Sequence, residues 1–92
     1  MPERTLIVAD PSGLHARPAA RFVQAASRFE SRIVIRHDGH EADAKSLIAL
    51  LGLAIRPTSQ IVLAAVGPDA DAAIEGLVRE LAPYLGSASP NP

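Results

Sequence analysis

The apolar positions of this chain form short alternating runs and longer helical stripes, and these predict its elements. Residues 5–9 and 32–37 are rich in Leu, Ile and Val with partial alternation, as expected of strands that have one buried face. Residues 60–66 are almost wholly apolar, which predicts a central strand with a neighbour on each side. Asp38-Gly39 separates the second run from residues 40–43, so we expect a tight turn between two antiparallel strands.

Two stretches carry apolar residues at helical spacing. The first begins near residue 15, and Pro18 is compatible with it because a first-turn proline lacks an N–H that would have no partner there. The second covers about residues 69–85, where Pro83 is expected to end or bend the helix. The first helix should bury one stripe and expose the opposite one. The expected buried stripe is Ala19, Phe22, Val23, Ala26 and Phe29, and the expected polar stripe is Arg17, Arg21, Gln24 and Arg28. In the last helix the residues expected to be buried are Ile74, Leu77, Val78 and Leu81.

A third and shorter apolar segment covers residues 47–53. It has five large aliphatic side chains in seven residues, more than one buried stripe of a two-turn helix can hide. We therefore expect some of them to be exposed as a contact surface, with complete burial under the loops as the alternative. Ser46 directly precedes the segment and is a good N-cap residue.

The resulting order, β-α-β-β-α-β-α, predicts an α+β fold with helices on one face of a mostly antiparallel sheet. With 92 residues the chain is long enough for one small domain, which we place at residues 1–85. Residues 86–92 have nothing to bury and are expected to form a disordered tail.

Composition narrows the classes of partner. A formal net charge of −1 argues against direct nucleic-acid binding and against binding to anionic membranes. The chain has no cysteine, no apolar run of membrane-spanning length and no signal-peptide pattern at its start. We expect a cytoplasmic monomer that is not inserted in a membrane.

The main candidate for chemistry is the segment Gly-Leu-His-Ala-Arg-Pro-Ala-Ala at residues 13–20. It places His15 at the expected start of the first helix, where free N–H groups and the helix dipole attract anions. Arg17 adds a guanidinium fork that suits phosphate oxygens. These residues predict a site where an imidazole nitrogen takes up a phosphoryl group. The plainer alternative is that His15 only begins the helix and that Arg17 is solvated.

Residues 10–19, Asp-Pro-Ser-Gly-Leu-His-Ala-Arg-Pro-Ala, resemble the active-site signature of the HPr family, the histidine phosphocarriers of the bacterial sugar phosphotransferase system. Ala44-Lys45-Ser46-Leu47 is similar to the segment in which the family carries a regulatory serine. The resemblance extends from about residue 5 to about residue 85 without an insertion. It implies an open-faced β-sandwich with strand order 1-4-2-3 and three helices on one face.

The resemblance also implies a mechanism and a set of partners. Neutral His15 would attack phosphorus through Nδ1, while Ala16 and Arg17 hold the phosphoryl oxygens. The donor would be the phosphoenolpyruvate-dependent first enzyme of the phosphotransferase system, the acceptors its sugar-specific receiving domains, and an HPr kinase/phosphorylase would act on Ser46. The implied docking residues are Pro18, Ala20, Arg21, Gln24, Leu47, Ile48 and Leu51.

The sequence contains no general base, metal cluster or phosphate-cradling glycine loop, so we expect a carrier and not an enzyme, with no cofactor and no metal. His37 and His40, with Asp43 nearby, could hold a metal loosely, but polar residues at a hairpin tip are more often solvated. Ser12 is expected to shape the turn before His15.

Two alternative functions remain open. One is a regulatory phosphosignalling relative for nitrogen or carbon control, and the other is a small interaction module without covalent chemistry. Partner choice is in question because Ile48 and Leu51 replace methionines that many family members carry. Gln24, Ser27 and Ala49 stand where lysines are often found, and Thr58 stands where glycine is common.

Overall fold

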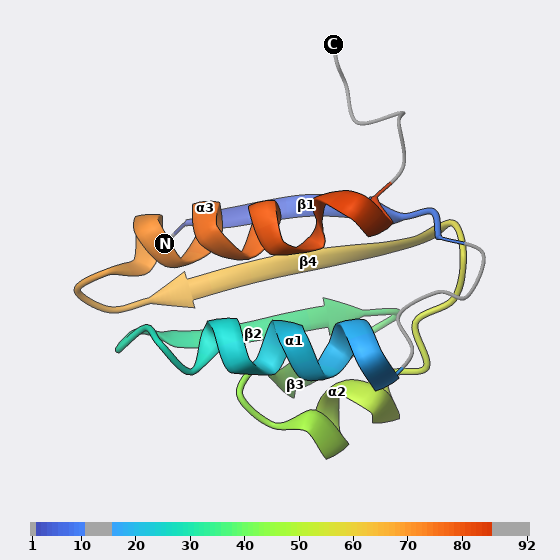
Figure 1. Cartoon of the computed structure of the whole chain (residues 1–92), viewed down its shortest axis with the longest axis horizontal. Coiled ribbons are helices and arrows are strands. Elements are labelled where there is room, and N and C mark those ends of the chain that lie inside the picture. Colours follow the sequence, from blue (N-terminus) through green and yellow to red (C-terminus); the bar gives the residue numbers. More distant parts are fainter. Residues whose placement is uncertain (1, 11–15, 86–92) are drawn as a thin grey trace, which may run out of the picture.

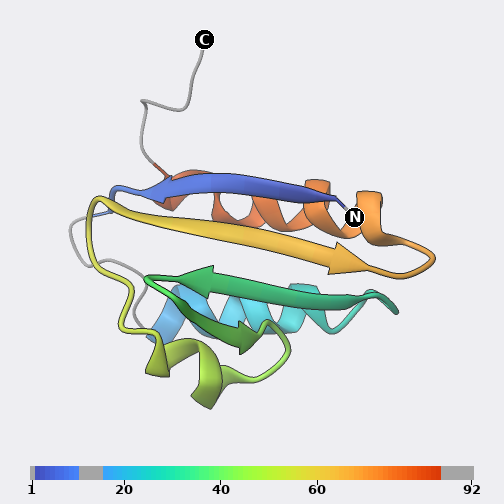
Figure 2. The same cartoon turned by 180° about the vertical axis from the view of Figure 1, so that it is seen from behind.

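The chain folds into a four-stranded antiparallel sheet with three α-helices on one face (Figures 1 and 2). The structure is a computed structural model that describes residues 2–10 and 16–85. The sheet has the order β1-β4-β2-β3, and its strands are β1 (Glu3–Val8), β2 (Arg32–His37), β3 (His40–Asp43) and β4 (Ser59–Val66). The helices are α1 (Ala16–Ala26), α2 (Leu47–Gly52) and α3 (Ala70–Leu81), and a 3₁₀ turn (Ala82–Tyr84) follows α3. The predicted fold class and strand order are confirmed.

Strand β4 is the central strand that its apolar run predicts. It pairs with β1 on one side and with β2 on the other, both antiparallel. Its inward side chains, Ile61, Leu63 and Ala65, are buried in the core under the helices. Burial of these side chains therefore stabilises the middle of the sheet through the hydrophobic effect, and β1 and β3 form the two edges of the sheet.

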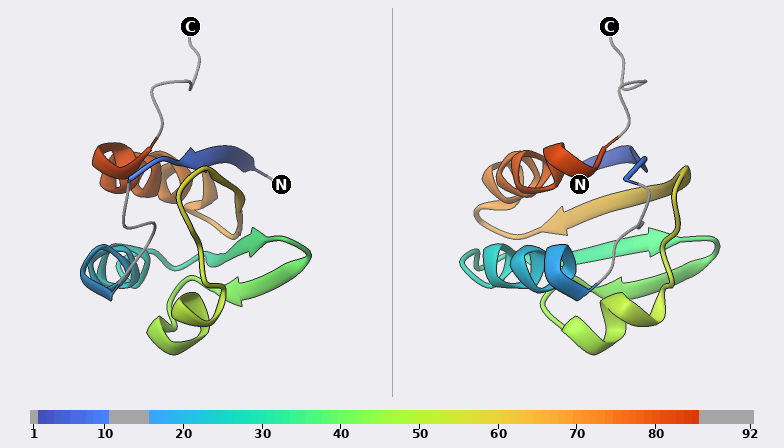
Figure 3. Two further views of the ribbon diagram at one scale, coloured as in Figure 1. Left: turned by 90° about the vertical axis from the view of Figure 1, so that its right-hand side faces the viewer. Right: turned by 45° about the vertical axis from the view of Figure 1, so that its right-hand side comes forward.

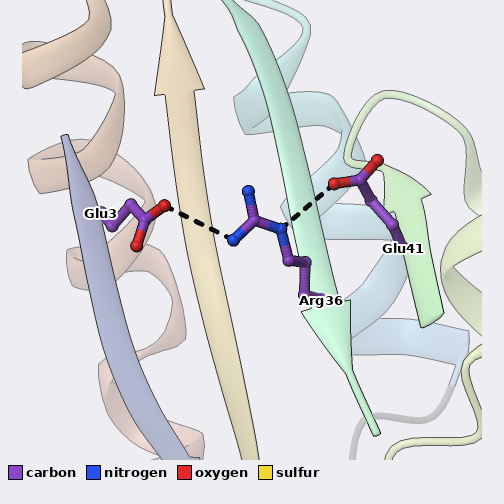
Figure 4. A network of polar contacts seen from close by, with 3 residues as sticks. All are labelled: Glu3, Arg36 and Glu41. Atoms are coloured by element: carbon purple, nitrogen blue, oxygen red, sulfur yellow. Dashed lines mark hydrogen bonds and ion pairs between the residues drawn. The ribbon is translucent and has the colours of Figure 1, made fainter. Parts of the chain in front are cut away.

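The opposite face of the sheet is open and carries a short row of charges across the strands (Figure 4). Arg36 of β2 reaches Glu41 of β3 through Nε at 3.1 Å and Glu3 of β1 through Nη1 at 3.4 Å. The hydrogen bond that Arg36 donates to the Glu41 carboxylate is the main reason that the pKa of Arg36 is raised. Because all three side chains are exposed, these pairs stabilise the fold only weakly.

Helices α1 and α3 pack against each other and cover the inner face of the sheet. Ala19, Phe22 and Ala26 of α1 are buried as predicted, but the helix ends at Ala26, so Phe29 lies in the following turn. Its ring packs against Gly76 of α3, where an added Cβ would lie 3.0 Å from it. No helix in residues 2–10 and 16–85 is long and apolar enough to cross a membrane.

The last helix is shorter than the expected residues 69–85. Regular α-helix stops at Leu81, two residues before Pro83, because proline has no N–H to continue the α-helical hydrogen bonds. Ala82 keeps helical dihedral angles, but its N–H donates to the carbonyl oxygen of Arg79, and a 3₁₀ turn follows. The predicted tail, residues 86–92, lies outside the described residues.

A polar latch joins the loop after α1 to the loop before α3. The Asp69 carboxylate accepts hydrogen bonds from the N–H groups of Glu30 and Ser31, each at 2.9 Å, and from the buried Ser31 hydroxyl. Gly67 makes the approach possible, since a Cβ at this position would lie 2.6 Å from Ser31 Oγ and its φ of 147° is reserved for glycine. We call Ser31, Gly67 and Asp69 the Ser31–Asp69 latch.

Asp69→Asn is expected to lower the melting temperature at neutral pH. The carboxylate now accepts hydrogen bonds from two N–H groups and a hydroxyl, and the amide N–H of asparagine would face one of these donors with no acceptor between them. The Ser31 hydroxyl and the Glu30 N–H hold the pKa of Asp69 below its ordinary value of 3.8. This stabilisation is therefore present above the ordinary pKa and is lost as the pH falls through the lowered pKa of the folded state. Thermal unfolding at decreasing pH should show the parent and the variant converging below about pH 4.

Asp71→Asn is the matched control, because Asp71 is an exposed acid in the first turn of the same helix. It should shift the melting temperature little at any pH. A difference between the parent and Asp69→Asn that does not depend on pH would contradict the role of the carboxylate.

Candidate functional site

Helix α1 begins at Ala16, the residue directly after His15 in the sequence. His15 and Ser12 lie outside the described residues, so their roles stay predictions. Ala16 and Arg17 are exposed at the helix start. The first N–H groups of a helix have no partner within it and carry the positive end of its dipole. This end of α1 can therefore bind an anion next to Arg17.

The solvent face of α1 is positively charged. Arg17, Arg21 and Gln24 are exposed on it, as predicted, and the helix contains no acidic residue. Neither Arg17 nor Arg21 forms an ion pair with any of the described residues. The chain as a whole has a net charge of −1, so the positive charge is concentrated locally on this face. Such a face can attract an acidic protein surface or a phosphoryl group.

Helix α2 packs beside α1 (Figure 3), and some of its apolar side chains are exposed. Ile48 is 86% exposed and Leu51 39% exposed, whereas Leu50 is buried at 1%. The prediction that a two-turn helix cannot hide all its aliphatics is confirmed. Ile48 and Leu51 are the exposed ones, and we call them the α2 patch.

The other predicted docking residues differ in exposure. Arg21 and Gln24 are exposed, Ala20 is half-buried, and Leu47 is half-buried and packs against the core. Pro18 has to be corrected, because its ring is buried in the first turn of α1 and gives a partner no surface.

Ser46 is the N-cap of α2, as its position before the apolar segment predicts. Its backbone is extended, with φ −117° and ψ 112°, and its hydroxyl accepts a hydrogen bond from the N–H of Ala49 at 3.2 Å. Ser46 is only half-buried, and it directly precedes the helix that carries the α2 patch. Capping of this kind stabilises a helix start by about 1 kcal/mol.

Lys45 ties α2 to α1, a contact that the sequence did not predict. Its ammonium donates to the carbonyl oxygen of Phe29 at 2.7 Å, in the turn after α1. Its own N–H donates to Asp43 Oδ1 at 2.9 Å. Lysine is ordinarily a solvated surface residue, so nothing in the pattern singled it out. The contact fixes the residue before Ser46 relative to α1.

Residues 2–10 and 16–85 contain no group of three or more His, Cys, Asp or Glu side chains arranged to hold a metal ion. The described part of the site thus consists of a helix start, arginines, the serine cap and the α2 patch. Such an arrangement can receive and orient a charged group and can dock a protein, but it has no general base of its own.

Comparison with known proteins gives a consistent result. The family model for the PTS HPr component phosphorylation site matches residues 2–82. The chain is 46% identical to the HPr-like protein Crh of Halalkalibacterium halodurans, over 85% of this chain and 93% of that protein. It is 41% identical to the phosphocarrier protein HPr of Treponema pallidum, over 83% of this chain and 86% of that one.

A solved structure agrees with these matches. The histidine-containing phosphocarrier protein of Mycoplasma superposes with a TM-score of 0.90 at 31% identity, covering 94% of this chain and all of the other. The sheet order, the helix start after His15 and the match over residues 2–82 lead to one conclusion: the chain belongs to the HPr family of phosphocarrier proteins.

Proposed function

We propose that the chain accepts a phosphoryl group on His15 Nδ1 from the phosphoenolpyruvate-dependent first enzyme of the phosphotransferase system. It then passes the group to sugar-specific receiving domains. The observation that carries this proposal is the start of α1 directly after His15, with Arg17 exposed and without an ion-pair partner among the described residues. The family match supports it.

Transfer at this site needs only modest stabilisation by the chain itself. The N–P bond forms at neutral His15 as the bond to the donor breaks, and the reverse happens at the acceptor. The N–H groups at the helix start, Ala16 included, and the Arg17 guanidinium would neutralise the phosphoryl oxygens. Binding the phosphorylated state too tightly would trap it, because uniform binding does not lower the barrier to release.

Docking would use the two neighbouring helices together. The arginines of α1 suit an acidic partner surface, and the α2 patch supplies apolar contact area beside them. We propose Arg21, Gln24, Ile48 and Leu51 as the main contacts, with Ala20 and Leu47 contributing their exposed parts. This exchange would take place in the cytoplasm, with residues 1–85 acting as one domain.

Ser46 is proposed as a regulatory phosphorylation site for an HPr kinase/phosphorylase. Its half-buried hydroxyl lies at the start of α2, where added negative charge suits the dipole. The phosphate would lie at the edge of the α2 patch, raise the desolvation cost of docking and repel an acidic partner.

A purely regulatory role is the second candidate, because the H. halodurans relative at 46% identity is an HPr-like Crh protein and the similar solved structure of Bacillus subtilis Crh is that of a catabolite repression HPr. A chain with only that role would take phosphate at Ser46 but would not pass a phosphoryl group from His15 to a receiving domain. A transfer assay therefore separates the two candidates.

The direct test is phosphorylation with the first enzyme and phosphoenolpyruvate, followed by addition of a receiving domain. The parent should gain an acid-labile phosphoryl group and lose it to the receiving domain. His15→Ala should abolish labelling while the circular dichroism spectrum stays unchanged. Labelling of His15→Ala at His37 or His40 would refute the assignment, and labelling of the parent without onward transfer would favour the regulatory role.

A second prediction concerns docking. Ile48→Asp and Leu51→Asp should weaken binding of the first enzyme about tenfold or more, because each removes apolar area and places a charge in the interface. Their melting temperatures should stay close to that of the parent, since both side chains are exposed. Titration calorimetry and thermal unfolding measure the two effects.

Two control variants separate an effect on docking from an effect on folding. Val66→Asp changes an exposed valine on the open face of the sheet and should leave binding unchanged, whereas Leu50→Asp changes a buried neighbour and should unfold the domain. If Ile48→Asp and Leu51→Asp bound like the parent, the α2 patch would not be a docking surface.

The Ser46 proposal is tested by separating charge from capping. Asp and Asn cap a helix about as well as Ser, so Ser46→Asp and Ser46→Asn differ mainly in charge. Ser46→Asp should bind the first enzyme more weakly than Ser46→Asn at similar melting temperatures. Ser46→Ala should lose roughly 1 kcal/mol of stability and still carry phosphate on His15. Equal affinities of the Asp and Asn variants would leave Ser46 as a helix cap only.

A further inference from the structure

The turn between β2 and β3 places two histidines directly opposite each other. His37 ends β2, His40 begins β3, and the two are paired in the strand register across Asp38-Gly39. Residues directly opposite on antiparallel strands project their side chains to the same face, about 5 Å apart at Cβ. Asp38 and Gly39 both have positive φ, 52° and 80°, as in the tight turns that fix hairpin geometry.

In both imidazole rings Nδ1 faces a backbone carbonyl oxygen. His37 Nδ1 lies 3.4 Å from the carbonyl oxygen of Gln60, and His40 Nδ1 lies 3.1 Å from that of Asp38. A carbonyl oxygen can only accept, so these contacts favour the neutral tautomer in which Nδ1 carries the proton and Nε2 keeps its lone pair. A hydrogen bond from the second ring nitrogen to a carbonyl is the usual support of a metal-bound histidine.

The pair borders an open cavity of about 370 Å³. Asp38 lines this cavity with the histidines, and its other walls are the end of α2 and Arg56. The same three hairpin residues also line a second hollow of about 430 Å³ at the strand ends. The rings therefore border space large enough for an ion and its waters.

We propose that His37 and His40 bind one divalent transition-metal ion of the Zn²⁺, Ni²⁺ or Cu²⁺ class through their Nε2 atoms. Imidazole nitrogens suit these ions, whereas Mg²⁺ and Ca²⁺ need oxygen ligands. Asp38 also lines the cavity, but it does not form a group of three ligands with the histidines, so water would complete the coordination. The sequence favoured a solvated hairpin tip and no metal, and this proposal departs from that expectation. It is independent of the proposed phosphocarrier function.

Two charged neighbours limit the site. Arg56 lines the cavity, and its positive charge disfavours a bound cation, so only ions with a strong preference for imidazole should bind. Asp43, which the sequence placed near the histidines, does not join them: its carboxylate accepts a hydrogen bond from the N–H of Lys45. The site thus rests on the two imidazoles.

The test is calorimetric titration of the full chain with ZnCl₂. His37→Asn and His40→Asn are suitable variants, because the asparagine amide can donate in place of Nδ1–H while Nε2 is removed. His15→Asn removes the third histidine of the chain and is the matched control. Loss even of an outer-shell partner weakens metal binding by about 10- to 100-fold, so loss of a ligand should weaken it at least about tenfold.

The parent and His15→Asn should bind one equivalent of Zn²⁺ with equal affinity, and His37→Asn and His40→Asn should each bind at least about tenfold more weakly. A parallel NMR titration of the unmutated chain should shift the ring signals of His37 and His40 together. The proposal is overturned if the parent binds no Zn²⁺, if either hairpin variant keeps the parent affinity, or if only the His15 signals shift.

Discussion

The burial of one stripe of α1 against the sheet determines where the functional side chains of this protein point. Ala19, Phe22 and Ala26 are completely buried, and two of them are alanines, which lets the helix approach the strands closely. Rotating α1 about its axis would expose Phe22 and force an arginine into the core, at a cost of several kcal/mol. The opposite stripe, including Arg17 and Arg21, is therefore held toward solvent. The chemistry proposed for the start of α1 depends on this packing.

Helix α2 extends this constraint to the docking surface. It has only six residues, too few to be stable alone, and it is held by the buried Leu50, by the Ser46 cap and by the Lys45 contact to the turn after α1. These contacts use one side of the helix and leave Ile48 and Leu51 outside. A charge added at Ser46 would consequently change the exposed surface without breaking a core contact, as a reversible control of docking requires.

Much of the fold followed from the sequence because burial is periodic in it. The uniform apolar run at residues 60–66 predicted the central strand, and Asp38-Gly39 predicted the β2–β3 turn. Helix ends were less predictable: α1 stops at Ala26, and the ring of Phe29 beyond it packs on Gly76 of a helix distant in sequence. The Ser31–Asp69 latch was missed for the same reason, since its partners are 38 residues apart and are common residue types.

The site was predictable in part. The spacing of His15 and Arg17 drew attention to the start of α1, and the excess of aliphatics predicted an exposed patch on α2. Which aliphatics are exposed depended on how α2 lies against the core, so Leu47 is more buried than expected. Pro18 is likewise more buried than expected, in the first turn of α1. The roles of the two hairpin histidines depend on ring orientation, which no sequence pattern carries.

The central claim is that the start of α1 holds a transferring phosphoryl group through Arg17. The most direct measurement is the rate of phosphoryl transfer to and from the chain in Arg17→Ala, compared with Arg28→Ala beyond the other end of the helix. Loss of one charge-assisted contact of about 1.5–3 kcal/mol predicts transfer slowed roughly 10- to 100-fold in Arg17→Ala. Arg28→Ala should transfer at the parent rate. Unchanged rates in Arg17→Ala, or equal losses in both variants, would contradict the account.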